Sequence, residues 1–426
     1  MATFQTPKGT YDILPADWPY WRLVTDTAER VARRYGYRRI DTPIFEATEL
    51  FARTSGESSD VVDKEMYTFE DKAGRSETLR PESTAPVVRA YIQHGMHKLP
   101  RPVRLYYVAA PNFRYDEVQE GRQRQFHVFG VEAFGEAAPT IDVEVISLLR
   151  DVYHELGLRD LTLAVNSTGC PLCRPAYVER LKAYYTENWD RICDDDRRRL
   201  RTNPLRVLDC KCPTCQPIAD AAPHIVDSLG PECRVHWDDL LHLLALHDIP
   251  YTVSHRLVRG LDYYTKTAFE FWPARAGAQS TIGGGGRYDG LAEQLGGPET
   301  PGIGFGTGVE RIILNLREAG IEPPPEEGPR VYVAYLGDEP HVRDEAYRTV
   351  ARIRAAGIGA SATTGKRKLP DQLKRAEGLG ARYAVIVGPD ELAVGNVAVR
   401  DLAARTQESL PADSLIPWLR ERNERD

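Results

Sequence analysis

Apolar positions along the chain recur first at helical spacing and then at strand spacing. Near the N-terminus, Trp21, Val24 and Ala28 lie three or four residues apart, which predicts an amphipathic helix over residues 17–35. Segments rich in β-branched and aromatic residues predict strands at 37–45, 103–109, 125–134, 250–258 and 267–272. Because no helix alternates regularly with these strands, the pattern predicts an α+β unit built on an antiparallel sheet.

The pattern changes in two places. Between residues 170 and 242, cysteines, a charged run and helix-like stretches interrupt the strands, which indicates a small helical insertion. Residues 322–329 contain four prolines and three glutamates, a composition typical of a stiff connector. Strands and helices alternate beyond it and predict a compact α/β domain. The predicted organisation is a core of 1–169 and 243–321, an insertion of 170–242, a linker of 322–329 and a C-terminal domain of 330–426.

Composition narrows the class of protein. A chain of 426 residues with 42% hydrophobic residues is too long for one ordinary core. Its sequence contains neither an apolar signal-peptide core nor the roughly 20 apolar residues of a membrane helix, so we expect a cytoplasmic protein. The net charge of −7 argues against a surface coated in positive charge, although a local basic surface remains compatible with it.

Two patches carry polar groups suited to charged ligands. Arg114 and Arg124 belong to a predicted strand–turn–strand segment, where their guanidinium groups would suit a phosphate or carboxylate. The alternative is an exposed hairpin with solvated charges. Glu82 and Thr84 would share one face of an extended segment and suit an ammonium group; a turn with satisfied polar groups is the alternative.

Residues 257–271 (LVRGLDYYTKTAFEF) place Arg259 close to Tyr263 and Tyr264. A buried arginine beside two phenols is costly without an anionic partner or ligand, which makes this segment a candidate site. The alternative is a half-buried strand pair with an exposed arginine.

Two glycine-rich segments follow. The glycines of 283–289 (GGGGRYD) permit close backbone approach to a ligand, or they form a simple loop. Residues 302–316 predict an apolar strand leading into a helix, with Arg311 near the helix start, where it would face a nucleotide phosphate. The segment differs from a dinucleotide-binding fingerprint because G-x-G-x-x-G within a βαβ unit is absent.

The seven cysteines suit thiols or metal ligands better than a disulfide framework in such a chain. A CxxC and a CxCxxC lie about 37 residues apart, close to the spacing of structural zinc sites. We predict that the ligands are Cys170, Cys173, Cys210 and Cys215. Free thiols in a small helical domain are the alternative.

Five candidate segments have now been described: that of Glu82 and Thr84, that of Arg114 and Arg124, and residues 257–271, 283–289 and 302–316. In their order along the chain, they resemble the motifs of histidyl-tRNA synthetases, a family of class II aminoacyl-tRNA synthetases. Residues 38–56 resemble the first class motif, a helix and strand of the dimer interface, 114–132 the second and 302–316 the third. LVRGLDYYTKTAFEF and GGGGRYDGL resemble the two histidine signatures of the family. The likeness extends over nearly the whole chain.

The resemblance implies a histidine–tRNA ligase. Such an enzyme uses ATP, with Mg²⁺, to form histidyl-adenylate, releases pyrophosphate and transfers histidine to the 3′ end of tRNA(His). The implied architecture is a class II antiparallel sheet with flanking helices, a small helical insertion and a C-terminal α/β anticodon-binding domain. A homodimer is expected, and neither a membrane nor DNA is an expected partner.

The resemblance also implies roles for individual residues. Arg259 and Arg114 are expected in catalysis, and ATP is expected to contact Arg114, Phe126 and Arg311. Histidine is expected to contact Glu82, Thr84, Arg114, Glu132, Arg259, Tyr263 and Tyr264. Expected tRNA contacts are Gln119, Arg124, Lys366 and Arg367. The last two lie in 361–380, where five basic residues against two acidic ones suit RNA phosphates, or form a solvated helix face.

One position departs from the family pattern. The family usually has a substrate-contacting glutamine where this chain has Val128, beside His127. Val128 removes a donor from the expected pocket, so histidine recognition would depend more on residues 257–271.

Two other classes of protein compete with the enzyme. A regulatory subunit of ATP phosphoribosyltransferase would resemble the synthetase core and bind histidine without catalysis, and Val128 is compatible with it. Such proteins usually lack the anticodon domain and the arginines, whereas Arg114, Arg259, Arg311 and residues 330–426 are present here. If the chain were a synthetase-like RNA-binding factor without catalysis, its ATP-binding motifs would have no function.

Overall fold

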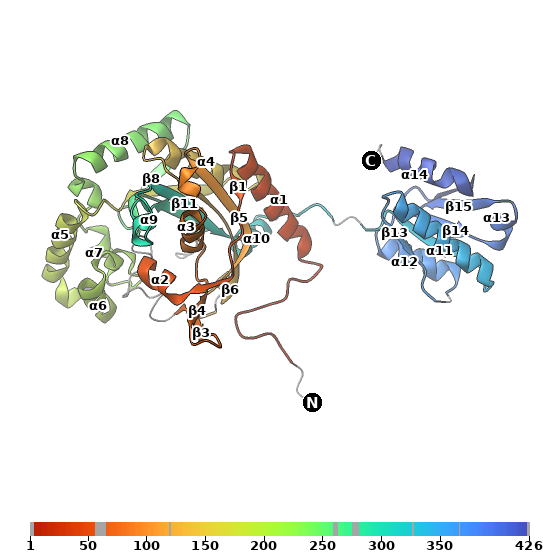
Figure 1. Cartoon of the computed structure of the whole chain (residues 1–426), viewed down its shortest axis with the longest axis horizontal. Helices are drawn as coiled ribbons and strands as arrows, with labels where there is room; N and C mark the ends of the chain where they lie inside the picture. Colours follow the sequence, from red (N-terminus) through yellow and green to blue (C-terminus); the bar gives the residue numbers. More distant parts are fainter. Residues whose placement is uncertain are drawn as a thin grey trace. The chain divides into compact units, whose positions relative to one another are not determined.

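The computed structural model describes residues 4–55, 65–118, 121–258, 263–274, 281–325, 328–365 and 367–423. The chain folds as two units, Met1–Pro324 and Pro325–Asp426 (Figure 1). The division between them falls within the proline-rich 322–329 segment. The finer boundaries of the insertion stay a prediction.

An eight-stranded sheet forms the centre of the first unit. Its neighbouring strands are antiparallel except at the two edges, where β1 pairs with β5 and β7 with β8 in parallel. The predicted antiparallel sheet is therefore confirmed. Across the sheet the order is β1 (Arg38–Arg39), β5 (Val103–Phe113), β6 (Gln125–Phe134), β11 (Gly302–Gly308), β10 (Gly283–Arg287), β9 (Thr265–Pro273), β7 (Leu161–Ser167) and β8 (Tyr251–Val253).

Helices cover this sheet and a smaller antiparallel sheet, of order β2–β4–β3, lies beside it. The small sheet consists of β2 (Phe45–Ala47), β4 (Ser76–Leu79) and β3 (Tyr67–Glu70). The described helices are α1 (Trp18–Arg34), α2 (Thr48–Ser55), α3 (Thr84–Gln93), η2 (Met96–Lys98), α4 (Pro139–Glu155), α5 (Arg174–Glu187), η3 (Trp189–Arg191), α6 (Asp194–Thr202), η4 (Pro204–Asp209), α7 (Gln216–Asp220), η5 (Ile225–Ser228), α8 (Pro231–Leu246), α9 (Leu291–Gln294) and α10 (Val309–Glu318).

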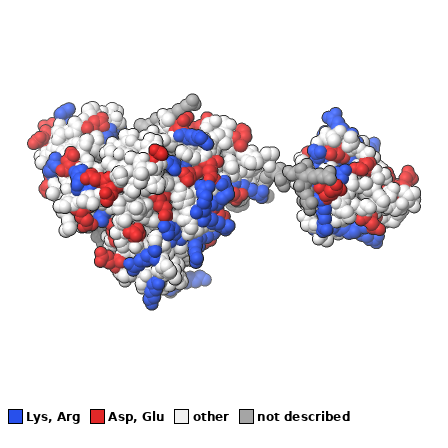
Figure 2. Space-filling view, turned by 90° about the horizontal axis from the view of Figure 1, so that it is seen from above, with Lys and Arg blue, Asp and Glu red and all other residues white. Residues whose placement is uncertain are grey.

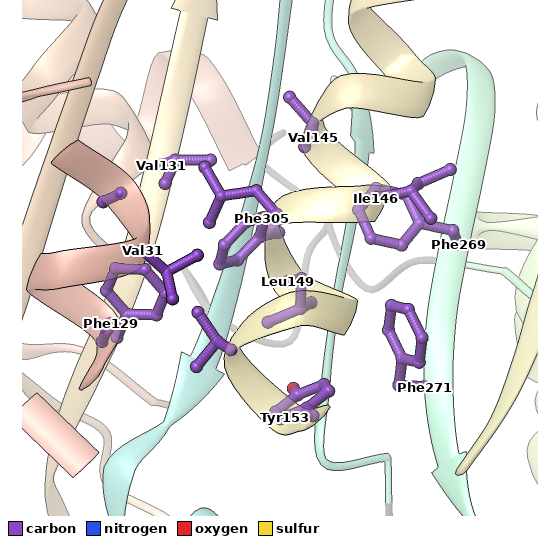
Figure 3. Close-up of a cluster of buried hydrophobic side chains, with 14 of the residues drawn as sticks. Val31, Phe129, Val131, Val145, Ile146, Leu149, Tyr153, Phe269, Phe271 and Phe305 are labelled. Atoms are coloured by element: carbon purple, nitrogen blue, oxygen red, sulfur yellow. The ribbon is translucent and has the colours of Figure 1, made fainter. Parts of the chain in front are cut away.

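The largest hydrophobic core lies between the sheet and helices α1, α4, α8 and α10. Helix α4 begins at Pro139, whose fixed φ suits the first helical turn. Its apolar stripe projects onto aromatic residues of the strands, as Figure 3 shows for Val145, Ile146, Leu149, Tyr153, Phe129, Phe269, Phe271 and Phe305. Trp237 and Leu240 of α8 join the same core, although they fall inside the predicted insertion.

The four glycines of 283–286 belong to the central strand β10 (Gly283–Arg287), so the alternative of a simple loop is wrong. A Cβ atom on Gly285 would lie 1.9 Å from the backbone oxygen of Gly304 on β11. A Cβ atom on Gly283 would lie 2.3 Å from the hydroxyl of Tyr153. Only glycine therefore permits this close pairing of β10 with its neighbours.

The prediction of a single strand over 37–45 is wrong. Arg38–Arg39 pairs with β5 in the large sheet, whereas Phe45–Ala47 pairs with β4 in the small sheet. Pro43 cannot donate a backbone hydrogen bond, which interrupts a continuous ladder. The guanidinium group of buried Arg80 instead binds the carbonyl oxygens of Thr42 and Pro43 at 3.0 and 3.3 Å.

The second unit is a five-stranded mixed sheet with helices packed on it, as its alternating pattern predicts. The strand order is β13 (Ala360–Ala362), β12 (Val331–Tyr335), β14 (Tyr383–Val387), β15 (Asn396–Asp401) and β16 (Thr406–Pro411). Its helices are α11 (Pro340–Ala355), α12 (Leu369–Gly378), α13 (Pro389–Ala393), η6 (Ala412–Ser414) and α14 (Leu415–Asn423). None of the described helices, in either unit, is long and apolar enough to cross a membrane.

Candidate active site

A cavity of about 330 Å³ opens over the glycine-rich centre of the large sheet. Strands β6, β10 and β11 supply its floor, and the residues around α3 and the β5–β6 hairpin supply its walls. Eight of the residues predicted from the sequence line it: Glu82, Thr84, Arg114, Phe126, Val128, Tyr263, Tyr264 and Arg311. The fold thus brings together segments more than 200 residues apart in the chain.

Glu82 and Thr84 lie at the start of helix α3, not in an extended segment. The carboxylate of Glu82 accepts hydrogen bonds from the backbone N–H groups of Thr84 and Ala85, at 2.5 and 2.8 Å. A carboxylate that caps a helix N-terminus in this way is favoured by the helix dipole. The extended conformation is therefore wrong, yet both side chains still face the cavity.

Glu132 lies directly behind the cavity wall and is fully buried. Thr84 donates a hydrogen bond to its Oε1 at 2.8 Å, Tyr107 donates to Oε1 at 3.1 Å, and Tyr288 donates to Oε2. A Cβ atom on Gly304 would collide with Oε2, so glycine at this position makes room for the carboxylate.

Burial has the largest effect on the pKa of this carboxyl group. It raises the pKa of Glu132 to about 8, although the hydroxyl donors Tyr288, Thr84 and Tyr107 oppose the shift. Burial likewise raises the pKa of Glu82, against the hydrogen bonds from Ala85 and Thr84. Two buried carboxyl groups in one wall form an environment that a cationic ligand would stabilise.

Arginines occupy another part of the cavity. Arg311 on α10 donates from Nε to the carbonyl of Gly121 at 3.2 Å and from Nη1 to that of Thr281 at 2.6 Å. Burial lowers its pKa, and the neighbouring Arg122 and Arg114 lower it further. Within the part of the chain that the structure describes, Arg311 forms no ion pair. Such a group of arginines is stabilised by a polyanion.

Arg114 links the two ends of the cavity. Its Nε donates to the carbonyl of Pro81, next to Glu82, at 2.9 Å, and its guanidinium carbon lies 5.7 Å from the centre of the Phe126 ring. Phe126 offers a flat apolar surface for an aromatic ligand beside this cation. Val128, two residues along β6, adds a second apolar side chain.

Several predicted site residues lie elsewhere. Arg124 does not line the cavity; its guanidinium carbon lies 4.0 Å from the centre of the Tyr115 ring, and Nε donates to the carbonyl of Asp116. Arg367 belongs to the second unit. Arg259, Gln119 and Lys366 lie outside the described residues, so their positions stay predictions.

Sequence reasoning missed several residues that line the cavity or contact its wall. Tyr107 and Tyr288 donate hydrogen bonds to Glu132, and Glu270 and Glu310 add carboxylates to the cavity lining. Tyr288 belongs to the GGGGRYD segment that was already a candidate, so its signal was available. Glu270 likewise belongs to the candidate segment 257–271. Tyr107 is an ordinary alternating strand residue, and only the register of the sheet reveals where it points.

The predicted four-cysteine ligand set requires correction. The structure places Cys170 and Cys173 with Cys233, whereas Cys210 and Cys215 lie with Cys193 and Asp196. Cys170 and Cys173 directly precede α5 and lie with Cys233 in the first turn of α8, whereas Cys210 and Cys215 lie between η4 and α7. The spacing of the two cysteine motifs along the sequence therefore did not predict which cysteines lie together in the structure.

An antiparallel sheet that carries a polar cavity of this kind, together with a separate α/β unit, is the architecture of class II aminoacyl-tRNA synthetases. The family model "Histidyl-tRNA synthetase" matches residues 9–170 and 221–312, and the model "Anticodon binding domain" matches residues 330–422. The chain belongs to the histidyl-tRNA synthetase family.

Relatives and solved structures agree with this assignment. The chain is 51% identical over 413 residues to "Histidine--tRNA ligase" of Dehalococcoides mccartyi, covering 97% of this chain and 98% of the relative. It is 51% identical over 418 residues to that of Moorella thermoacetica, covering 98% of each. The apo histidyl-tRNA synthetase of S. aureus superposes with a TM-score of 0.82 at 39% identity, covering 98% of this chain and 99% of that one.

The fold alone is also shared with a Bacillus halodurans protein described as an ATP phosphoribosyltransferase regulatory subunit/histidyl-tRNA synthetase. That structure matches at 21% identity with a TM-score of 0.65 and covers 91% of this chain and 99% of that one. The much higher identity to the ligases favours the enzyme over the regulatory subunit.

Proposed function

We propose that this chain is a histidine–tRNA ligase, which activates L-histidine with ATP and transfers it to the 3′ end of tRNA(His). One observation carries the proposal: a single cavity holds buried carboxyl groups in one wall and arginines in another. The first suits the ammonium group of an amino acid and the second suits a triphosphate. Ligase relatives at 51% identity over nearly the full length support the same function.

Histidine would bind at the carboxylate end. Glu82 and Glu132, with Thr84, would bind its ammonium group, and Tyr263 and Tyr264 would pair with the imidazole. Imidazole offers both a donor and an acceptor, so a pocket that pairs both rejects apolar amino acids, which would leave its polar groups unsatisfied. Val128 supplies no hydrogen bond, so this discrimination would depend on the tyrosines.

ATP would bind at the arginine end. Phe126 would stack on adenine, Arg114 would contact the α-phosphate and Arg311 the γ-phosphate. Mg²⁺ prefers oxygen ligands, and the carboxylates of Glu270 and Glu310 in the same wall suit it. The ion would neutralise charge on the phosphates.

In the first step, a carboxylate oxygen of histidine attacks the α-phosphorus and the bond to the β-phosphate oxygen breaks, releasing pyrophosphate. Negative charge grows on the phosphoryl oxygens, where fixed cationic donors stabilise it without reorganising. Arg114 and Arg259 would act as these donors. In the second step, the terminal ribose hydroxyl oxygen of tRNA attacks the carbonyl carbon of histidyl-adenylate. The bond from that carbon to the phosphate oxygen breaks, so AMP leaves and the hydroxyl proton is released as the ester forms.

The remaining partners follow from the family. The second unit would bind the anticodon, with Arg367 and Lys366 near the RNA phosphates, and Gln119 and Arg124 would contact the acceptor end. A homodimer would form through residues 38–56. A cytoplasmic location fits these partners.

The decisive test is histidine-dependent exchange between ATP and pyrophosphate by the purified chain, followed by acylation of tRNA(His). We expect both activities. Histidine binding without exchange would support the regulatory subunit instead and overturn the ligase. Omitting histidine, or supplying another amino acid, provides the control.

The Arg259→Ala variant tests the catalytic assignment. Loss of one transition-state donor should lower the exchange rate about 100- to 1,000-fold, while the dissociation constant for histidine changes little. The matched control is Arg343→Ala, an exposed residue of the second unit, which should leave exchange unchanged. Equal losses in exchange and in histidine binding would contradict the role of Arg259 in the transition state.

A further inference from the structure

A compact group of metal-ligand side chains lies outside the cavity. The ligand atoms of Cys193, Asp196, Cys210 and Cys215 all lie within 4.8 Å of one another. Cys193 precedes α6 and Asp196 lies in its first turn, while Cys210 follows η4 and Cys215 precedes α7. Two chain segments therefore converge on one point.

The spacing of the sulfur atoms matches tetrahedral coordination. A Zn–S bond is about 2.3 Å long, so two sulfur ligands of a tetrahedral zinc lie about 3.8 Å apart. The Sγ atoms of Cys193 and Cys210 are 3.8 Å apart. A disulfide would require about 2.05 Å, and all seven cysteines are free thiols in this structure.

Asp196 supplies independent evidence for a cation. Its side chain is fully buried, and its Oδ2 atom has no hydrogen-bond partner. The nearest charge is that of Arg199, whose Nη1 lies 3.4 Å from Oδ1. A buried carboxylate with an unsatisfied oxygen is costly, and a metal ion at this oxygen removes the cost.

The local backbone supports the same arrangement. The N–H group of Cys193 donates to the Sγ atom of Cys215 at 3.2 Å, a bond that stabilises a thiolate. Cys193 and Asp196 are separated by two residues and Cys210 and Cys215 by four, which are spacings of structural zinc sites. Cys212 does not belong to this group of ligand atoms, and its Sγ atom contacts Thr214 Oγ1 at 3.1 Å.

We propose that Cys193, Asp196, Cys210 and Cys215 bind one zinc ion. Three thiols release their protons on binding, and three thiolates and one carboxylate then surround the divalent cation. Four protein ligands complete its tetrahedral shell, so the ion is structural and has no open position for substrate.

The site would also affect the candidate active site. Arg256 donates to the carbonyl oxygens of Leu208 and Cys210, each at 3.2 Å, and to Asp220 at 2.8 Å. Arg256 directly precedes residues 257–271. Zinc therefore fixes the backbone to which the start of this segment is attached, and its loss should slow adenylate formation as well as lower the melting temperature.

The second group, Cys170, Cys173 and Cys233, offers three thiols without a fourth ligand among the described residues. It serves here as a control. The cluster differs from the zinc site in this respect, although the Sγ atoms of Cys170 and Cys173 are 3.7 Å apart.

The test is metal analysis of the purified, untagged full-length chain by mass spectrometry. We expect about one zinc ion per chain, lost in Cys215→Ser and retained in Cys212→Ser and Cys170→Ser. Cys212→Ser is a matched control because it lies in the same CKCPTC segment. Asp196→Cys should keep the metal, whereas Asp196→Ala should release it more readily to a chelator.

Cobalt substitution provides a second readout that does not depend on enzyme activity. The native chain and Cys212→Ser should both show tetrahedral d–d bands and a strong thiolate-to-cobalt charge-transfer band. Cys215→Ser, which loses the metal, should show little of that band, because only two sulfur ligands and one carboxylate remain. Where the Cys215→Ser variant does not fold, the spectrum of Cys170→Ser decides the proposal, because the band should persist when the second group is disrupted.

Three results would overturn the proposal. The first is a native chain that holds no zinc and gives no tetrahedral cobalt spectrum. The second is equal metal loss in Cys212→Ser and Cys215→Ser, or metal loss only in Cys170→Ser. The third is an intact mass lower by two hydrogens without reductant, which would indicate a disulfide in place of the metal.

Discussion

Glu132 shows how one buried residue can connect substrate binding to protonation. Its carboxyl group receives three hydroxyl donors, yet burial raises its pKa to about 8. A substrate ammonium group would favour the ionised form, so histidine binding should release this proton below that pH.

We therefore predict that histidine affinity rises with pH up to about pH 8, by as much as about tenfold per pH unit, and that Glu132→Gln removes this part of the dependence. Calorimetric titration at several pH values measures it. The titration of histidine itself affects both proteins equally, so the difference in slope isolates Glu132. Identical slopes would contradict the assignment.

The same residue makes stability depend on pH. The folded chain keeps the proton up to about pH 8, whereas the unfolded chain releases it near the ordinary glutamate pKa of 4.5. The stabilising contribution is therefore complete below pH 4.5 and is lost as pH rises to about 8. Urea unfolding should show this loss in the native chain and not in Glu132→Gln. Tyr288→Phe, which removes a donor to the ionised form, should move the upper limit to higher pH.

At the scale of elements, strand β10 sets the floor of the cavity. Its glycines lie between β9 and β11, and Gly285 approaches the backbone of Gly304 too closely for any side chain. On the neighbouring strand β11, the absence of a side chain at Gly304 leaves room for Glu132. The glycines of β10 form a strand because they pair with β9 and β11, and not because glycine itself favours the strand conformation.

Gly285→Ala should lower the free energy of unfolding by about 3 kcal/mol, because the added methyl group overpacks against fixed backbone. The control is Gly290→Ala, since no atom lies within 4 Å of a Cβ built there. Urea denaturation measures both variants. Comparable stability losses would show that strand pairing does not limit position 285.

At the scale of the whole molecule, the cavity and the part of the chain that matches the anticodon-binding domain model lie in separate units. All residues that line the cavity belong to the unit ending at Pro324, and residues 325–426 have cores of their own. Positive and negative side chains are interspersed over the face shown in Figure 2, in keeping with the net charge of −7.

Removing residues 325–426 should leave histidine-dependent exchange intact and lower the efficiency of tRNA acylation on the order of a hundredfold, which is about 2.8 kcal/mol. The physical reason is that the cavity is complete without the second unit, whereas anticodon contacts are lost. Exchange and acylation assays on the full chain and on residues 1–324 measure the effect. A parallel loss of both activities would show that the units do not act separately.

The sequence by itself determined the elements that depend on local pattern. Helix α1, strand β6 and the β11–α10 unit lie where their periodicity predicts them, within a residue or so. The order of five patches also identified the family, and eight of the predicted residues line one cavity. Local spacing and side-chain chemistry are sufficient for these features because they do not depend on distant contacts.

Only the tertiary structure decided which distant residues meet. Tyr107 and Tyr288 converge on Glu132, residues 37–45 divide between two sheets, and the cysteines form two groups that motif spacing did not reveal. These outcomes depend on strand register and helix packing across long stretches of chain. The burial that raises the pKa of Glu132 arises in the same way, because desolvation belongs to the folded environment and not to the residue.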